Sequence, residues 1–287
     1  MFARPFSHWG PGWRGEKNLK RTLFVLAALA TVIPMAAAQS LYNNGTFGRT
    51  NVTGLEGLHT PGSTLTGNPA GTRISEVGAD GVIAGYGAQG DSTNNNRMAD
   101  DFVVTGPAWN VTSVNLFMYQ TGNTGTIGAA GSITGANVSI VNDSGGPVGS
   151  TALTGTFQSA VFTDLHRAFN GDADGWRRQV QNVTVSFSGN LAPGTYWLVF
   201  QATGTGTTGP WAPYVANSNP ANGYADGSMN AMQSLTGGAW TFVEDGITAP
   251  RRQDLPFYIN GSPVPEPATM TALALGAVAL LRRRRKA

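Results

Sequence analysis

The segment "NGDADG", from Asn170 to Gly175, has the residue types and the spacing that come closest to a metal-binding motif. Asn170, Asp172 and Asp174 place side-chain oxygens at alternate positions, and Gly175 stands where a calcium-binding loop makes its sharp turn. The second half of such a loop is missing, since position twelve is Gln181 instead of a bidentate glutamate. Two interpretations therefore stay open: a weak Ca²⁺ site, or a polar hairpin loop in which Asp and Gly serve turn geometry.

The remaining acidic residues and the histidines do not form a recognisable catalytic group. A glycosidase needs two carboxylates that face each other across a cleft. Asp100 and Asp101 are neighbours on an alternating segment and therefore point to opposite faces of a strand, where we expect them to satisfy backbone groups. His59 and His166 have no G-x-S-x-G serine motif beside them, and we expect His166 to be a half-exposed strand residue. We assign no catalytic residue, and a glycoside hydrolase or lyase is only the third hypothesis.

Tryptophan is the residue type that offers a contact with sugar. Trp211 lies between two prolines in "GPWAPY", with Tyr214 close behind it, and flat exposed aromatic rings of this kind stack on sugar rings. The sequence offers a glycan contact at Trp211 and Tyr214, although a role in the core or as a loop staple is the favoured interpretation of Trp211. Trp197, in "GTYWLVF", is expected in the core, with Tyr196 on the opposite face of the strand.

The elements that must position these residues are β-strands. Branched and aromatic residues alternate with polar ones, a period of two that favours strands with one buried face, and turn-forming stretches such as "DSGGPVG" and "GNLAPG" separate them. The alternating segments are "DDFVVT", "WNVTSVNLFMYQTG", "ANVSIVND", "TGTFQSAVFTDL", "QVQNVTVSFSGN", "GTYWLVFQATG", "GAWTFVED" and "DLPFYING". They predict an all-β fold, an antiparallel, jelly-roll-like β-sandwich over residues 39–262, with strands near its N-terminus adding to the edge. A barrel is the alternative.

The cationic residues are concentrated at the two ends of the chain. Between Gln39 and Ser262 there are eight arginines, no lysine and fourteen carboxylates, a formal net charge of −6, although the whole chain carries +2. A nucleic-acid partner, which requires a basic face to neutralise phosphates, is therefore disfavoured for the body, and we expect none. The chain has no cysteine, so neither disulfides nor thiolate chemistry can contribute.

The N-terminal segment predicts export. "KNLKRTLFVLAALATVIPMAAAQS" combines a cationic start, an apolar stretch from Leu23 to Ile33, and small residues Ala36 and Ala38 immediately before Gln39. This order predicts a signal peptide over residues 1–38, a helix that is removed on export. A buried hydrophobic helix is the alternative.

The C-terminal segment, residues 263–287, contains a fourteen-residue apolar run from Ala268 to Leu281. At about 1.5 Å per residue this run reaches about 21 Å, short of the roughly 30 Å of a hydrocarbon core. We expect a short transmembrane helix that holds the following cations in the cytoplasm, and therefore a body on the far side of the membrane. The cytoplasmic stop consists of Arg282, Arg283, Arg284 and Arg285.

The motif Pro265-Glu266-Pro267 precedes the apolar run, and its prolines predict an extended segment at the outer boundary of the membrane. A PEP motif, an apolar run and an arginine cluster, in this order, resemble the PEP-CTERM sorting signal of exopolysaccharide-producing Gram-negative bacteria. The resemblance implies recognition by an exosortase, a membrane-embedded cysteine transpeptidase, and removal of the tail. It also implies a transient anchor in the inner membrane, before release to the cell envelope or the extracellular space. A simple tail anchor is the alternative.

The body resembles secreted bacterial β-sandwich proteins of unknown activity between Ala99 and Gly261, in blocks such as "LAPGTYWLVFQATGT" and "QDLPFYING". That resemblance supplies no catalytic residues. We therefore expect an exported, non-enzymatic surface or matrix protein associated with exopolysaccharide, without a cofactor unless Ca²⁺ binds. A carbohydrate-binding module, assisted by calcium, is the alternative function.

Overall fold

The computed structural model describes most of the predicted body. The described residues are 39–44, 56–58, 73–77, 85–91, 93–169, 177–206, 208–213, 229–245, 251–265 and six positions between 271 and 283. The predicted signal peptide, residues 1–38, lies outside them.

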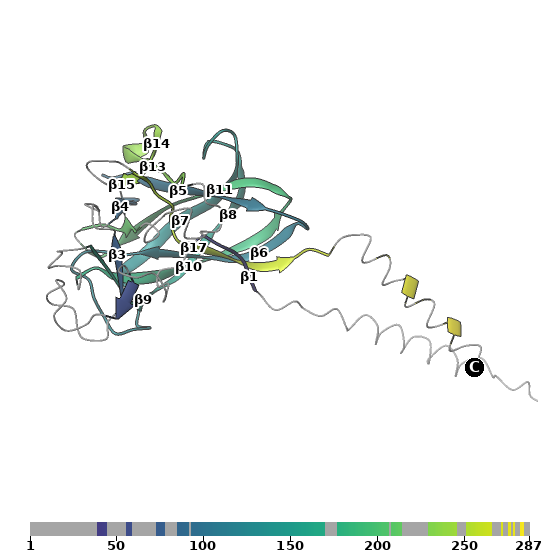
Figure 1. Ribbon diagram of the computed structural model, residues 1–287, viewed down its shortest axis with the longest axis horizontal. Helices are drawn as coiled ribbons and strands as arrows, with labels where there is room; N and C mark the ends of the chain where they lie inside the picture. Colours follow the sequence, from purple (N-terminus) through teal and green to yellow (C-terminus); the bar gives the residue numbers. More distant parts are fainter. Residues whose placement is uncertain are drawn as a thin grey trace, which may run out of the picture. The chain divides into compact units, whose positions relative to one another are not determined.

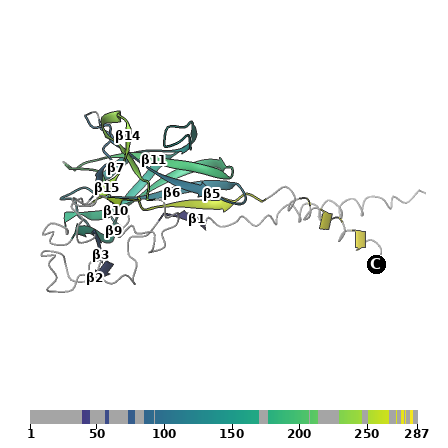
Figure 2. The ribbon, with the colours of Figure 1, turned by 45° about the horizontal axis from the view of Figure 1, so that its top comes forward.

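Within this part of the chain, two β-sheets pack face to face (Figures 1 and 2). The seven-stranded sheet has the spatial order β1 (Gln39–Asn43), β17 (Phe257–Pro263), β6 (Trp109–Met118), β10 (Gln179–Leu191), β9 (Thr156–Phe169), β3 (Arg73–Val77) and β2 (Glu56–Leu58). The six-stranded sheet has the order β14 (Trp240–Phe242), β13 (Met232–Ser234), β5 (Arg97–Val104), β11 (Gly194–Gly204), β7 (Ile133–Asn142) and β8 (Thr151–Thr154).

Two further strand pairs lie beside the main sheets. β4 (Tyr86–Gly87) pairs with β12 (Trp211–Ala212), and β15 (Glu244–Asp245) pairs with β16 (Arg251–Arg252). A single 3-10 turn, η3 (Leu235–Gly237), follows β13 in the described residues. The predicted all-β sandwich is confirmed, and the barrel alternative is wrong because the strands form separate sheets. β3 departs from the antiparallel pattern, since it pairs in parallel with β9.

The alternation in the sequence determines which side chains enter the sandwich. In β10, Val183 and Val185 are fully buried, whereas Asn182 and Thr184, which alternate with them, are half-buried on the outer face. Branched side chains fit such a pleated, half-buried surface well. The strand therefore presents one apolar face to the other sheet and one polar face outward.

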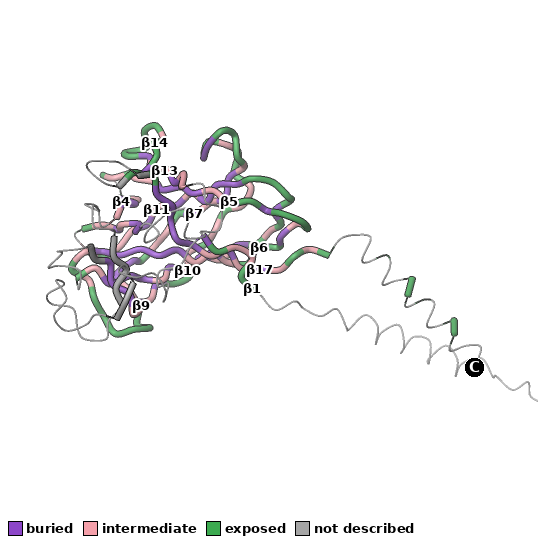
Figure 3. Tube along the Cα trace, viewed as in Figure 1, coloured by how far each residue is buried: buried purple, intermediate pink, exposed green. Residues whose placement is uncertain are grey.

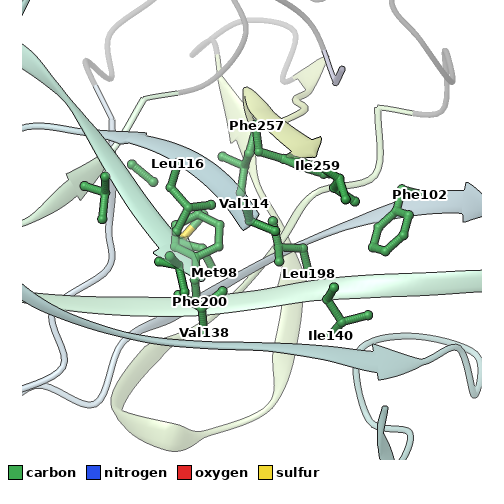
Figure 4. Close-up of a cluster of buried hydrophobic side chains, with 14 of the residues drawn as sticks. Met98, Phe102, Val114, Leu116, Val138, Ile140, Leu198, Phe200, Phe257 and Ile259 are labelled. Carbon is green, nitrogen blue, oxygen red and sulfur yellow. The ribbon is translucent and has the colours of Figure 1, made fainter. Parts of the chain in front are cut away.

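The core lies between the two sheets, where apolar side chains from each sheet point toward those of the other (Figure 4). Figure 3 shows that the buried residues follow the central strands, while exposed residues gather in the loops. Complete burial of one Phe, Leu, Ile or Val side chain contributes about 1.5–3 kcal/mol. The residues labelled in Figure 4 are Met98, Phe102, Val114, Leu116, Val138, Ile140, Leu198, Phe200, Phe257 and Ile259.

The C-terminal segment is described only at scattered positions after Pro265. Those positions are helical and exposed: Thr271, Leu275, Gly276, Val278, Arg282 and Arg283. Within the described residues, no helix combines the length and the apolar composition that crossing a membrane requires. The short transmembrane helix expected over Ala268–Leu281 therefore stays a prediction.

Candidate functional site

Trp211 is fixed by backbone pairing on two sides. In β12 it lies opposite Gly87 of β4, and on its other side its N–H donates to the Tyr119 carbonyl oxygen at 2.8 Å. The Tyr119 N–H donates back to the Trp211 carbonyl oxygen at 3.0 Å. Gly209 has a φ of +85°, and a Cβ there would lie 2.6 Å from Trp211 Cδ1, so only glycine fits beside the indole. These constraints fix the backbone at Trp211, whose ring is half-buried.

The indole lines a cleft of about 340 Å³ at the end of β11. The cleft lies between the turn after β4 and the segment that leads into β12. Its lining brings together amide, hydroxyl, carboxylate and aromatic groups, a combination that can hydrogen-bond to hydroxyls and stack on a ring face. The polar and aromatic side chains that line it are Gln89, Asp91, Asn94, Thr203, Thr208 and Trp211.

Asp91 gives this cleft an ionised group. Its Oδ1 accepts from the N–H of Asn94 at 2.6 Å and from the N–H of Thr93 at 2.7 Å. These backbone bonds, that of Asn94 first, lower the pKa of Asp91 because they favour the charged carboxylate. The exposed carboxylate can therefore accept hydrogen bonds from a ligand at neutral pH.

The structure places one of the two predicted glycan contacts, Trp211, in this cleft. Tyr214 lies outside the described residues. Sequence reasoning missed Asp91 and Asn94, because "GDSTNNN" reads as an ordinary surface loop. What brings this loop to the cleft is the bond from the Gly90 N–H to the Ala202 carbonyl oxygen at 2.9 Å, a contact between distant segments.

The predicted metal site, Asn170, Asp172 and Asp174, falls outside the described residues, so calcium binding stays a prediction. Among the residues that the structure does describe, no three His, Cys, Asp or Glu side chains form a group that could hold a metal ion.

Asp100 connects the two sheets. Its carboxylate, which is fully buried in β5, accepts from Asn44 Nδ2 at 2.7 Å and from the Leu255 N–H at 2.6 Å. Asn44 and Leu255 adjoin β1 and β17 of the seven-stranded sheet. The expectation that Asp100 satisfies backbone groups is thus met at Leu255, across the sandwich.

Two further expectations have different outcomes. His166 is buried, with 8% of its surface exposed, so the expectation of a half-exposed residue is wrong. The reason is that β9 is an interior strand, paired with β10 on one side and with β3 on the other. Trp197 and Tyr196 are both buried, in separate clusters on opposite faces of β11, as expected. Trp197 Nε1 also donates to Asp143 Oδ1 at 2.7 Å.

The sorting segment begins where the last strand of the sandwich ends. Pro263 lies opposite Trp109 in β6, and the Val264 N–H donates to the Ala108 carbonyl oxygen at 2.7 Å. Pro265 follows directly and is exposed. Of the other predicted sorting residues, Arg282 and Arg283 are exposed and helical, whereas Glu266, Pro267, Arg284 and Arg285 lie outside the described residues.

The β-sandwich is followed directly by a short tail that contains proline, leucine and arginine. This is the arrangement of a folded body with a C-terminal sorting signal. Residues 263–286 match the family model of the PEP-CTERM protein-sorting motif. A comparison with curated proteins finds no match to the chain. The predicted resemblance is confirmed, and it supports exosortase-dependent sorting of an exported protein.

Proposed function

We propose that this protein is a non-enzymatic surface or matrix protein that associates with exopolysaccharide after export. The observation that carries the proposal is the sorting motif at residues 263–286, which begins at Pro263, the last residue of β17. Exosortase-dependent processing would release a compact β-sandwich to the cell envelope or the extracellular space.

The outer face of the seven-stranded sheet supports association with a hydrated polymer. Side-chain amides form a ladder across three strands: Asn260 Nδ2 donates to Asn115 Oδ1 at 2.8 Å, and Asn115 Nδ2 donates to Asn182 Oδ1 at 2.9 Å. Asn115 Nδ2 also lies 3.1 Å from Thr184 Oγ1. Half-buried amides and hydroxyls of this kind retain donors and acceptors for sugar hydroxyls without bringing charge.

The positions of the carboxylates support a non-catalytic role. Asp100 is committed to the link between the sheets, Asp91 closes a turn, and Asp143 accepts from the Trp197 indole. Each of these three carboxylates is occupied by donors of the protein itself.

Cell fractionation tests this proposal. We expect the mature protein to sediment with the exopolysaccharide of the producing cells and to be released when that polysaccharide is digested. Purified mature protein should release no oligosaccharide from the same polymer. Recovery in the polysaccharide-free supernatant before digestion would refute the association, and release of oligosaccharides would refute the non-enzymatic role.

A carbohydrate-binding module is the second candidate, and the cleft at Trp211 is the observation that favours it. A glycan array with the purified protein would identify a ligand. Trp211→Ala should then weaken binding at least tenfold, or about 1.4 kcal/mol, because the ring supplies the stacking surface. Trp240→Ala is the matched control, since Trp240 is also half-buried but does not line the cleft. Equal losses in the two variants would argue against the cleft.

A further inference from the structure

We propose that one end of the sandwich rests on the lipid surface of the membrane while the sorting segment is still attached. This end, called here the tail end, consists of the loops 105–108, 143–150 and 192–193 together with Gln39 and Val264. The inference rests on the sorting function, since it requires the C-terminal segment to hold the precursor at a membrane.

The strand register places these loops at the same end of both sheets. Pro263, the last residue of β17, lies opposite Trp109, and Leu191, the last residue of β10, also lies opposite Trp109. In the other sheet Gly194, at the start of β11, lies opposite Val104, at the end of β5. The loops between β5 and β6 and between β10 and β11 therefore flank the point where the chain leaves the sandwich (Figure 1).

The first strand begins at this same end. Gln39 pairs with Gly261, and β1 lies beside β17 at the edge of the seven-stranded sheet. The predicted signal peptide ends at residue 38, so both segments that engage the export pathway join the body at the tail end. A precursor held by either segment presents the same end of the sandwich to the membrane.

The connection between the sandwich and the apolar run is too short to hold the tail end away from the membrane. Val264 is fixed by its bond to the Ala108 carbonyl oxygen. Only residues 265–267 separate it from Ala268, where the apolar run begins, and three extended residues span at most about 10 Å. The body of the sandwich is longer, since the ten residues of β6 extend over about 34 Å. The tail end must therefore lie next to the membrane surface.

The chemistry of the tail end suits an anionic lipid surface. Its three loops contain one ionisable side chain, Asp143, although the body as a whole carries a formal charge of −6. Asp143 Oδ1 accepts from Trp197 Nε1 at 2.7 Å and from the Gly146 N–H at 3.0 Å, so it is held against the protein. Val148 projects from the longest of these loops with 66% of its surface exposed. Repulsion from anionic headgroups is smallest at such an end, and the valine can enter the interface.

The absence of cysteine allows a site-specific test in residues 39–287, the chain without the predicted signal peptide and with the sorting segment still attached. Val148→Cys and Ile127→Cys would each carry one fluorophore, in vesicles of phosphatidylethanolamine and phosphatidylglycerol that contain a nitroxide-headgroup lipid. Ile127 is the matched control, because it is 65% exposed and lies in the loop between β6 and β7, at the opposite end. Val278→Cys reports insertion of the tail. We expect the labels at 148 and 278 to lose most of their emission and the label at 127 to keep nearly all of it.

A spacer separates the effect of the short connection from other causes. A Gly/Ser insertion of about ten residues after Val264 adds a root-mean-square reach of about 17 Å. We expect it to restore much of the emission at position 148 without changing that at 278.

Equal quenching at 148 and 127, with the label at 278 quenched, would overturn this inference and leave the sorting function intact. An unquenched label at 278 would overturn the inference together with the membrane attachment on which it rests. Quenching at 148 that requires an exosortase in the vesicles would assign the contact to the enzyme and overturn the lipid contact.

Discussion

Replacing Asp100 with alanine should weaken the sandwich by removing a link between its two sheets. Asp100 is fully buried in β5, and its Oδ2 accepts from Asn44 Nδ2 and from the Leu255 N–H. Its Oδ1 accepts from the Asp101 N–H at 3.0 Å. Two of these three donors belong to segments that adjoin the opposite sheet. The substitution therefore removes a link between layers as well as a local contact.

The magnitude follows from the groups left behind. A hydrogen bond to a charged group contributes about 1.5–3 kcal/mol, and a buried donor left unpaired costs about 1–3 kcal/mol. Asn44 Nδ2 retains its bond to the Leu255 carbonyl oxygen at 3.0 Å, so the Leu255 N–H suffers the larger loss. These contributions overlap, and together they lead us to expect that Asp100→Ala lowers the free energy of unfolding by about 3–5 kcal/mol. Asp100→Asn, which keeps one acceptor oxygen, should cost about half as much.

Urea unfolding of the mature protein, followed by tryptophan fluorescence, measures this loss. With a slope of about 2 kcal/mol per molar urea, the midpoint should fall by about 1.5–2.5 M. Glu244→Ala is the control, because Glu244 is exposed and should shift the midpoint by about 0.5 M or less. A loss below about 1 kcal/mol for Asp100→Ala at an unchanged slope would refute the view that this carboxylate ties the sheets together.

Three further predictions concern the loops. In Gly131→Ala the new Cβ would clash with Oε1 of Gln181, a side chain that is fully buried. A thermal melt should therefore show a loss of about 2 kcal/mol in the free energy of unfolding. An unchanged melting temperature would mean that the amide moves aside. The pKa of Asp91 is lowered in the folded protein, so the contribution of this carboxylate to stability is present above its ordinary pKa and is lost as the pH falls through the lowered pKa. The free energy of unfolding, measured against pH, should show this loss of stability in acid for the wild type and not for Asp91→Asn. Calorimetry with millimolar Ca²⁺ should show binding to the wild type and none to Asp172→Asn, and no heat with the wild type would exclude the site.

The strands of the main sheets could be predicted because their alternation is local. The segment "GTYWLVFQATG" predicts a strand over the same residues, 194–204, that form β11. The short strands β4 and β12 carry no such signal, since two residues cannot display a period. β3 is also invisible to this reasoning, because its parallel pairing with β9 depends on a partner almost a hundred residues away along the chain. These strands form only because distant segments of the chain pair with one another.

The candidate site was only partly predictable for the same reason. The type and setting of Trp211 mark it as a possible sugar contact, but nothing around it in the sequence indicates Asp91 or Asn94 as neighbours. Asp91 and Asn94 come close to Trp211 only through the β4–β12 pair and the hydrogen bond from the Gly90 N–H to the Ala202 carbonyl oxygen. A loop of Asp, Ser, Thr and Asn has the same composition whether it faces solvent or a cleft.

The placement of β17 links folding to processing. β17 is an interior strand between β1 and β6, although it is the last strand in the chain. The pairing of Gln39 with Gly261 joins nearly the two ends of the body, so this sheet cannot be completed until almost the whole chain has been exported. Contacts at such sequence separation form slowly, and an attached tail would keep the folding body at the membrane during that time. Cleavage before Phe257 would remove a fully buried strand residue and expose the core, whereas cleavage after Val264 leaves every backbone pair of β17 in place. The boundary between fold and sorting signal therefore lies at Val264, and the position of the cut decides whether the released body remains folded.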